Sequence, residues 1–130
     1  MSICIASAGS VLTFLAGSFS LTWIHSVEKT EWVEHWQVEG DRLALVSARV
    51  KGPGAGIDLP PDAVWEEGGW TYRPALPPLS QINLAASGTT PSGWQFCTED
   101  KCMELGATAG AATSIWAAHT CTESQPAQGQ

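Results

Sequence analysis

The chain has 130 residues, a length that suits one domain large enough to bury a hydrophobic core. Six Lys and Arg stand against thirteen Asp and Glu, and the resulting net charge of -7 repels phosphate backbones. This charge argues against nucleic-acid binding. Seven Trp, together with many Gly and Pro residues, favour a β protein with many turns over a helical one.

The N-terminal segment, residues 1–23, carries no charged side chain and must be weighed as a signal peptide or a membrane span. A signal peptide needs a basic start, yet no Lys or Arg precedes Lys29. A span needs about 20 mainly apolar residues, whereas Ser, Thr and Gly interrupt this stretch repeatedly. The spacing instead predicts three short strands, at residues 2–7, 11–15 and 19–24, and no transmembrane segment.

Two hairpins are predicted next. Residues 31–38 and 42–50 flank a turn at Glu39-Gly40-Asp41. The second arm is apolar on both faces, which predicts a central position in a sheet. Residues 63–73 predict another hairpin that turns at Gly68-Gly69. In the first hairpin, the arm at residues 31–38 is predicted to turn one set of alternating side chains inward: Trp32, Glu34, Trp36 and Val38.

The glycine-rich residues 51–56, followed by Pro60-Pro61, predict a long shaped loop. Further strands are predicted at residues 81–86, 94–98, 101–105 and 113–117, and Gly106 and Gly110 weaken the alternative of a helix over residues 107–118. The expected fold is all-β: a single antiparallel β sandwich or flattened barrel of about ten short strands, with adjacent N- and C-terminal strands. We expect this domain to cover residues 1–122 and a disordered polar tail to follow at residues 123–130.

Three motifs carry a resemblance to a known family. They are Trp23-Ile24-His25-Ser26-Val27-Glu28-Lys29-Thr30-Glu31-Trp32, then Ala48-Arg49-Val50-Lys51-Gly52-Pro53-Gly54-Ala55-Gly56, then Trp70 with Tyr72-Arg73-Pro74 and Leu76-Pro77-Pro78-Leu79. With these motifs the chain resembles family 1850 of the domains of unknown function, over about residues 4–121. The resemblance implies no established activity. Family members are found beside genes for tripartite, binding-protein-dependent transporters, which implies partnership with components of a membrane transporter for carboxylates.

The motifs also define a candidate ligand site. An imidazole beside carboxylates, with an Arg opposite and exposed loop amides, is an arrangement that can bind a small organic acid. The alternative is structural: His25 closes a turn, and Glu28 pairs with Lys29 or Arg49. The candidate residues are His25, Ser26, Glu28, Glu31, Arg49, Lys51, Gly54, Ala55 and Gly56.

Two catalytic hypotheses use the same segment. His25, Glu28, Glu31 and His35 offer metal-ligand atoms, but their spacing matches no familiar metal signature. Ser26 cannot act with the adjacent His25 on extended backbone, because successive side chains point to opposite faces. We therefore expect a non-enzymatic accessory or small-ligand-binding domain without metal or cofactor. The alternatives are a metal-dependent or acid-base enzyme using His25 with Glu28 and Glu31, and a purely structural interaction module.

Four cysteines form two candidate disulfides. Cys97 and Cys102 flank a short turn, and a Cys4 to Cys121 bridge would join the two ends of the domain. Such bridges favour a periplasmic or other extracytoplasmic location. Four reduced thiols in a cytoplasmic protein remain the alternative, because no signal peptide is visible. The seven Trp likewise leave two roles open, as core residues or as a stacking platform for sugar or base rings.

Overall fold

The computed structural model describes residues 1–7, 9–24, 30–51, 59–86, 93–106 and 110–121. Within these ranges the structure is all-β, and all strand pairs are antiparallel. No helix in the described part of the chain is long and apolar enough to cross a membrane. The strands are β1 (Ser2–Ser7), β2 (Ser10–Phe14), β3 (Ser18–Ile24), β4 (Glu31–Glu39), β5 (Arg42–Lys51), β6 (Val64–Glu66), β7 (Gly69–Tyr72), β8 (Ile82–Ala86), β9 (Trp94–Cys97), β10 (Cys102–Leu105) and β11 (Gly110–Ala118).

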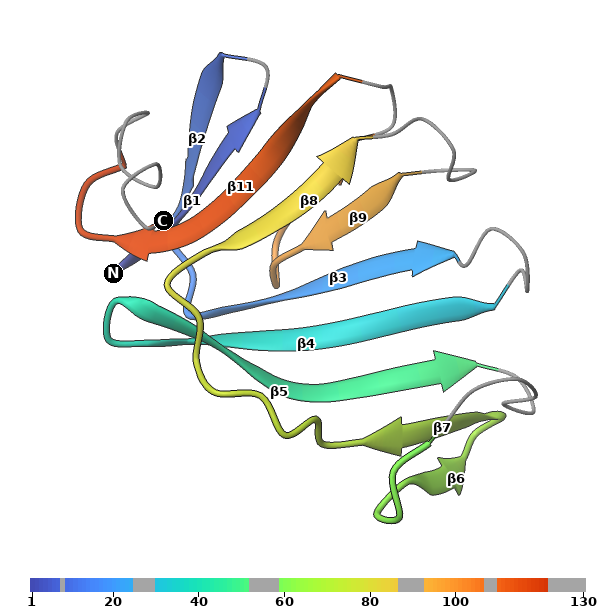
Figure 1. Ribbon diagram of the computed structural model, residues 1–130. Coiled ribbons are helices and arrows are strands. Elements are labelled where there is room, and N and C mark those ends of the chain that lie inside the picture. The colour runs from blue at the N-terminus through green and yellow to red at the C-terminus, as the bar shows by residue number, and fades with distance from the viewer. Residues whose placement is uncertain (8, 25–29, 52–58, 87–92, 107–109, 122–130) are drawn as a thin grey trace.

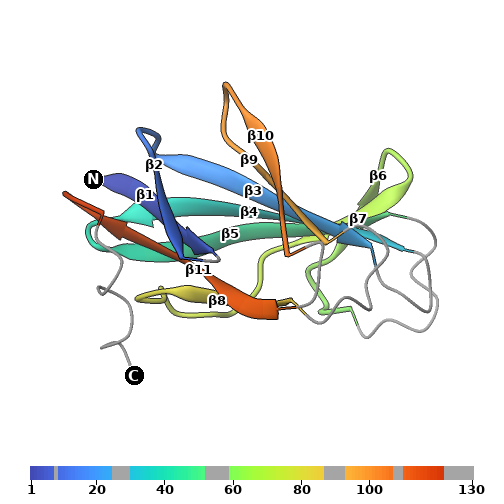
Figure 2. The same ribbon diagram turned by 90° about the horizontal axis from the view of Figure 1, so that it is seen from above.

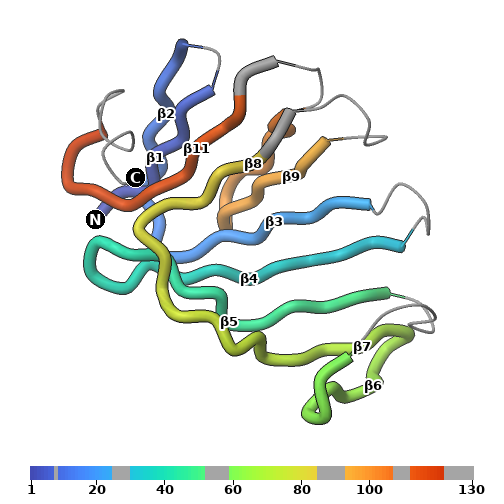
Figure 3. The backbone as a smooth tube through the Cα atoms, viewed as in Figure 1, coloured from blue at the N-terminus to red at the C-terminus, as the bar shows by residue number. Residues whose placement is uncertain are grey.

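The strands form two sheets that pack face to face (Figures 1 and 2). One has four strands in the order β2-β1-β11-β8, and the other has seven in the order β10-β9-β3-β4-β5-β7-β6. Figure 3 follows the chain from β7 through residues 73–81 into β8, where it changes sheet. The expected sandwich is thus confirmed, and the flattened barrel is not formed. The pairing of β1 with β11 confirms that the first and last strands are neighbours.

The hydrophobic core lies between the sheets. We call the face of the seven-stranded sheet that turns toward the four-stranded sheet its inner face, and the opposite one its outer face. Inner-face Phe19 and Phe96 pack together at 5.1 Å between ring centroids, beneath Ile3 and Ile115 of the smaller sheet. The core cluster contains no residue of β6 or β7, which extend beyond the four-stranded sheet (Figures 1 and 2). One end of the inner face is therefore not part of the sandwich core.

Both predicted hairpins are present. β4 and β5 join at the predicted turn, with Gly40 at a φ of 64°, and β5 is central between β4 and β7. The second turn lies one residue earlier than predicted: Glu67 and Gly68 have φ values of 51° and 80°, while Gly69 belongs to β7. Positive φ at both positions of a two-residue loop is the geometry that matches the twist of a hairpin. Residues 110–118 form a strand, and the tail at residues 123–130 lies outside the described residues.

Candidate functional site

Two residues of the predicted ligand site lie directly opposite each other at the ends of β4 and β5. Lys51 Nζ and Glu31 Oε1 are 2.8 Å apart. Both side chains lie on the outer face, because their strand neighbours Trp32 and Val50 are paired on the inner face. The Lys51 side chain is 57% exposed and that of Glu31 35%, so this ion pair is open to solvent.

Arg49 lies two residues before Lys51 on the same outer face. Its Nη1 donates to Thr71 Oγ1 at 3.3 Å, and its Nη2 donates to the backbone carbonyl of Glu67 at 2.7 Å. These contacts hold the guanidinium group beside the turn between β6 and β7. A Cβ atom on Gly69 would lie 3.1 Å from the guanidinium carbon, so the glycine leaves room for this arrangement.

The structure thus brings Glu31, Arg49 and Lys51 together on one face. The remaining members of the predicted site lie outside the described residues: His25, Ser26, Glu28, Gly54, Ala55 and Gly56. The described part of the site contains two cations and one carboxylate, with both cations in contact with protein oxygens.

The metal hypothesis combined four residues, of which the structure describes Glu31 and His35. Both lie on the outer face of β4, four residues apart. At roughly 3.3 Å per residue, their Cα atoms are separated by about 13 Å along the strand, too far for both side chains to bind one ion directly. Within the described ranges, no three His, Cys, Asp or Glu side chains gather in a way that could hold a metal ion.

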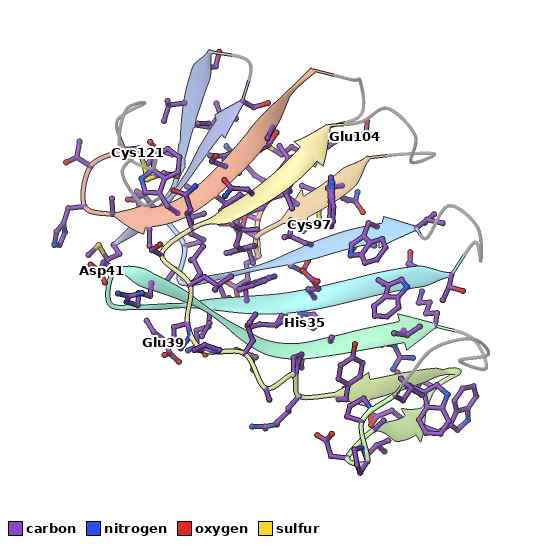
Figure 4. All side chains as sticks on the ribbon, in the orientation of Figure 1. His35, Glu39, Asp41, Cys97, Glu104 and Cys121 are labelled. Atoms are coloured by element: carbon purple, nitrogen blue, oxygen red, sulfur yellow. A yellow bond between two sulfur atoms is a disulfide. The ribbon has the colours of Figure 1, made fainter. Side chains whose placement is uncertain are left out.

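A hollow of about 360 Å³ adjoins Glu31 on the seven-stranded sheet. Glu104, labelled in Figure 4, lies across the hollow on β10, where it pairs with Gln95 of β9. The hollow therefore has carboxylates on two sides. Its lining residues are Thr22, Trp23, Ile24, Glu31, Gln95 and Glu104.

The inner face of the same sheet carries a row of tryptophans beyond the sandwich core. Register places Trp23 opposite Trp32 and Trp65 opposite Trp70, and Val50 connects the two pairs by facing both Trp32 and Trp70. We call this set the Trp row. Its members, in order across the sheet, are Trp94, Trp23, Trp32, Val50, Trp70 and Trp65.

Ring contacts join the members of the Trp row into two groups. Trp23 stacks on Trp32 with centroids 5.3 Å apart and meets Trp94 at 5.4 Å. Trp65 and Trp70 meet edge to face at 5.4 Å, and Trp65 is 50% exposed. Trp94 at one end of the row packs against the core, Val50 on β5 is fully buried, and Trp65 at the other end faces solvent.

Glu34 lies two residues after Trp32 on the same inner face, and nearer the core. The sheet register places it between Leu21 of β3 and Ala48 of β5. Trp36 donates its indole Nε1–H to Glu34 Oε1 at 3.0 Å. Burial raises the pKa of the Glu34 carboxyl group, and the hydrogen bond from Trp36 lowers it. Tyr72 faces Ala48 from the other side. Burial raises the pKa of Tyr72, and the negative charge of Glu34 raises it further.

Glu34 and Tyr72 were not among the predicted site residues. The signal for Glu34 was present in the sequence, since it shares a face with Trp32, Trp36 and Val38, and a carboxylate in an inward-facing aromatic set is costly without a partner. Tyr72 could not be found in this way. Its position opposite Ala48 follows from the pairing of β5 with β7, which the sequence does not specify.

Both expected disulfides are bonded. Cys97 and Cys102 are directly opposite in the β9–β10 hairpin, with Cα atoms 4.1 Å apart. Cys4 of β1 bonds Cys121, which follows β11, and Figure 4 shows Cys121 beside the four-stranded sheet. Two disulfides are compatible with an extracytoplasmic location.

Comparison with known proteins identifies a family. The model of a domain of unknown function, DUF1850, matches residues 19–105. This match extends from the second residue of β3 to the last residue of β10, so it contains almost all of the seven-stranded sheet and both faces described above. Comparisons with curated proteins and with solved structures gave no match. The chain therefore belongs to the family of domains of unknown function called DUF1850.

Proposed function

We propose that this protein is a non-enzymatic accessory domain that binds a small organic acid outside the cytoplasm, in association with a solute transporter. The observation that carries the proposal is the pair of cationic side chains, Arg49 and Lys51, that β5 presents on one face of the sheet. A carboxylate ligand requires such charges, and Arg forms charge-assisted, bidentate hydrogen bonds with it.

The present partners of these cations leave them available to a ligand. An exposed ion pair such as Lys51–Glu31 contributes only about 0–1 kcal/mol to stability, so an incoming carboxylate displaces Glu31 at little cost. Arg49 donates to two neutral oxygens, which fix its position without neutralising its charge. The guanidinium group is therefore oriented in advance, which lowers the entropic cost of binding.

The transporter partnership rests on the resemblance described above and on the two disulfides. Both support a domain that meets its solute on the side of the membrane where disulfides persist. The expected partners are therefore a small organic acid and components of a membrane transporter.

A thermal-shift titration with small mono- and dicarboxylates tests this proposal. We expect at least one acid to raise the melting temperature, because a ligand that binds only the folded state stabilises it. Lys51→Ala should remove that increase, while the control Lys101→Ala, which removes an exposed cation at the β9–β10 turn, should keep it. No increase with any acid, or the same increase in both variants, would contradict the proposal.

A further inference from the structure

We propose that the inner face of the seven-stranded sheet, where Glu34 lies beside the Trp row and Tyr72, binds an organic cation that carries an ammonium group. This site differs from the anion site in both face and charge. Arg49 and Lys51 alternate along β5 with Ala48 and Val50, and only the latter two point to the inner face.

The charge on this face argues for a cation. Glu34 is the only charged side chain that the described strands place on the inner face of the seven-stranded sheet. A half-buried carboxylate is costly unless a positive group or several hydrogen bonds compensate it. Trp36 is the single side-chain donor to Glu34 in the described part of the chain. A positive ligand group would supply the compensation that the described residues do not.

The surroundings of Glu34 suit an ammonium group in particular. Indole and phenol rings attract cations through the negative potential of their faces, and Trp does so most strongly. Trp32 precedes Glu34 by two residues on the same face, and Tyr72 lies on its other side across Ala48. A methylated ammonium group is apolar at its surface, so it can contact these rings and meet the carboxylate at the same time.

Among the described residues, this face is most exposed at the β6–β7 end of the sheet. The core cluster ends before these two strands, and the four-stranded sheet does not extend over them (Figures 1 and 2). Trp65 is 50% exposed at this end, and Trp70 and Tyr72 are half-buried. Trp32 and Glu34 are half-buried as well, whereas Ala48 and Val50 on β5 are buried. The partly exposed side chains on this face therefore run from Trp65 to Glu34.

A platform for neutral rings, such as sugars, would use the same tryptophans. A sugar hydroxyl would use Glu34 as a hydrogen-bond acceptor, a role that a neutral amide oxygen can also fill, whereas a cation depends on the negative charge itself. A charged ligand and an uncharged ligand of the same shape therefore distinguish the two kinds of site.

The test is calorimetric titration of the full chain with choline and with 3,3-dimethylbutan-1-ol. The second compound replaces the nitrogen of choline with carbon, so it keeps the shape and loses the charge. We expect choline to bind, and the uncharged alcohol to bind about tenfold more weakly or worse. Because this comparison uses the unchanged protein, it does not depend on whether any variant folds. Absence of choline binding, or equal binding of the two compounds, would overturn the proposal.

Two matched variants locate the site. Glu34→Gln keeps the size of the side chain and an acceptor for Trp36, and we expect it to weaken choline binding about tenfold or more. Glu104→Gln makes the same change on the outer face and should leave the affinity within about twofold. Equal effects of the two substitutions would overturn the proposal. Lys51→Ala should leave choline binding unchanged, so the anion site and the cation site can fail independently.

Discussion

Tyr72 on β7 lies within electrostatic reach of Glu34 on β4, with only Ala48 of β5 between them in the register of the sheet. Burial and the charge of Glu34 both raise the pKa of Tyr72. The two residues are 38 positions apart in sequence and come together only because β5 pairs with both β4 and β7.

This relationship predicts that Glu34→Gln lowers the pKa of Tyr72, because the substitution removes the negative charge and leaves the burial in place. Tyr72 is the only tyrosine in the chain, so the ultraviolet absorption of tyrosinate during an alkaline titration reports this one phenol. Glu104→Gln, on the outer face, should not change the titration. An unchanged curve for Glu34→Gln would show that the two side chains do not interact.

Glu34→Gln is also expected to change how stability depends on pH. Burial raises the pKa of Glu34, despite the opposing hydrogen bond from Trp36, so the folded protein takes up a proton at higher pH than the unfolded chain. The free energy of unfolding therefore gains a contribution as the pH falls toward the ordinary glutamate value of 4.5. Urea unfolding at neutral and mildly acidic pH should show this gain in the wild type and not in the variant. The same pH dependence in both proteins would exclude Glu34 as its source.

The two disulfides should contribute unequally to stability. Cys4–Cys121 spans 117 residues in sequence and Cys97–Cys102 only 5. If each bridge acts by restricting the unfolded chain, the first contributes about 5 kcal/mol and the second about 2 kcal/mol. Denaturant unfolding of the Cys4→Ser/Cys121→Ser and Cys97→Ser/Cys102→Ser proteins measures both. A larger loss from the short-range pair would contradict this account.

Gly69→Ala should disturb the sheet at the point where the Arg49 side chain packs over Gly69. A Cβ atom at this position would lie 2.8 Å from the carbonyl oxygen of Val50, a contact that forces the backbone to move. We expect a loss of about 1–3 kcal/mol in the free energy of unfolding. The control is Gly17→Ala, where the new Cβ has nothing within 4 Å and should change stability by less than about 0.5 kcal/mol. Equal stability of the two variants would mean that the close approach at Gly69 is not restrictive.

Much of the fold could be predicted from local patterns. Alternation along residues 31–38 predicted the inward face of β4, and the structure buries Trp36 and packs Val38 against the core. The apolar residues on both faces of β5 predicted its central position in the sheet, and that prediction is confirmed. The apolar pattern also has a second cause, a β-bulge in this strand. The register shifts between His35 and Trp36, so β5 turns Ala48 and Val50 inward on one side of the shift and Leu43 and Leu45 on the other.

The sites were less predictable, because they depend on which strands become neighbours. Motif residues suggested Arg49 and Lys51, and the structure places both on one face together with Glu31. The sequence did not show that Glu31 and Lys51 pair directly, or that Arg49 binds the Glu67 carbonyl. The Trp row also escaped prediction, since its members come from six strands whose order is set by tertiary pairing.

The central claim, that the inner face binds an organic cation, is tested most directly by nuclear magnetic resonance of the seven indole N–H groups during a choline titration. Trp32 and Trp70 lie in the Trp row, whereas Trp116 belongs to β11 in the other sheet and serves as an internal control. We predict that the signals of Trp32 and Trp70 shift progressively with choline while that of Trp116 stays fixed. Unchanged signals, or equal shifts at all seven indoles, would contradict the claim.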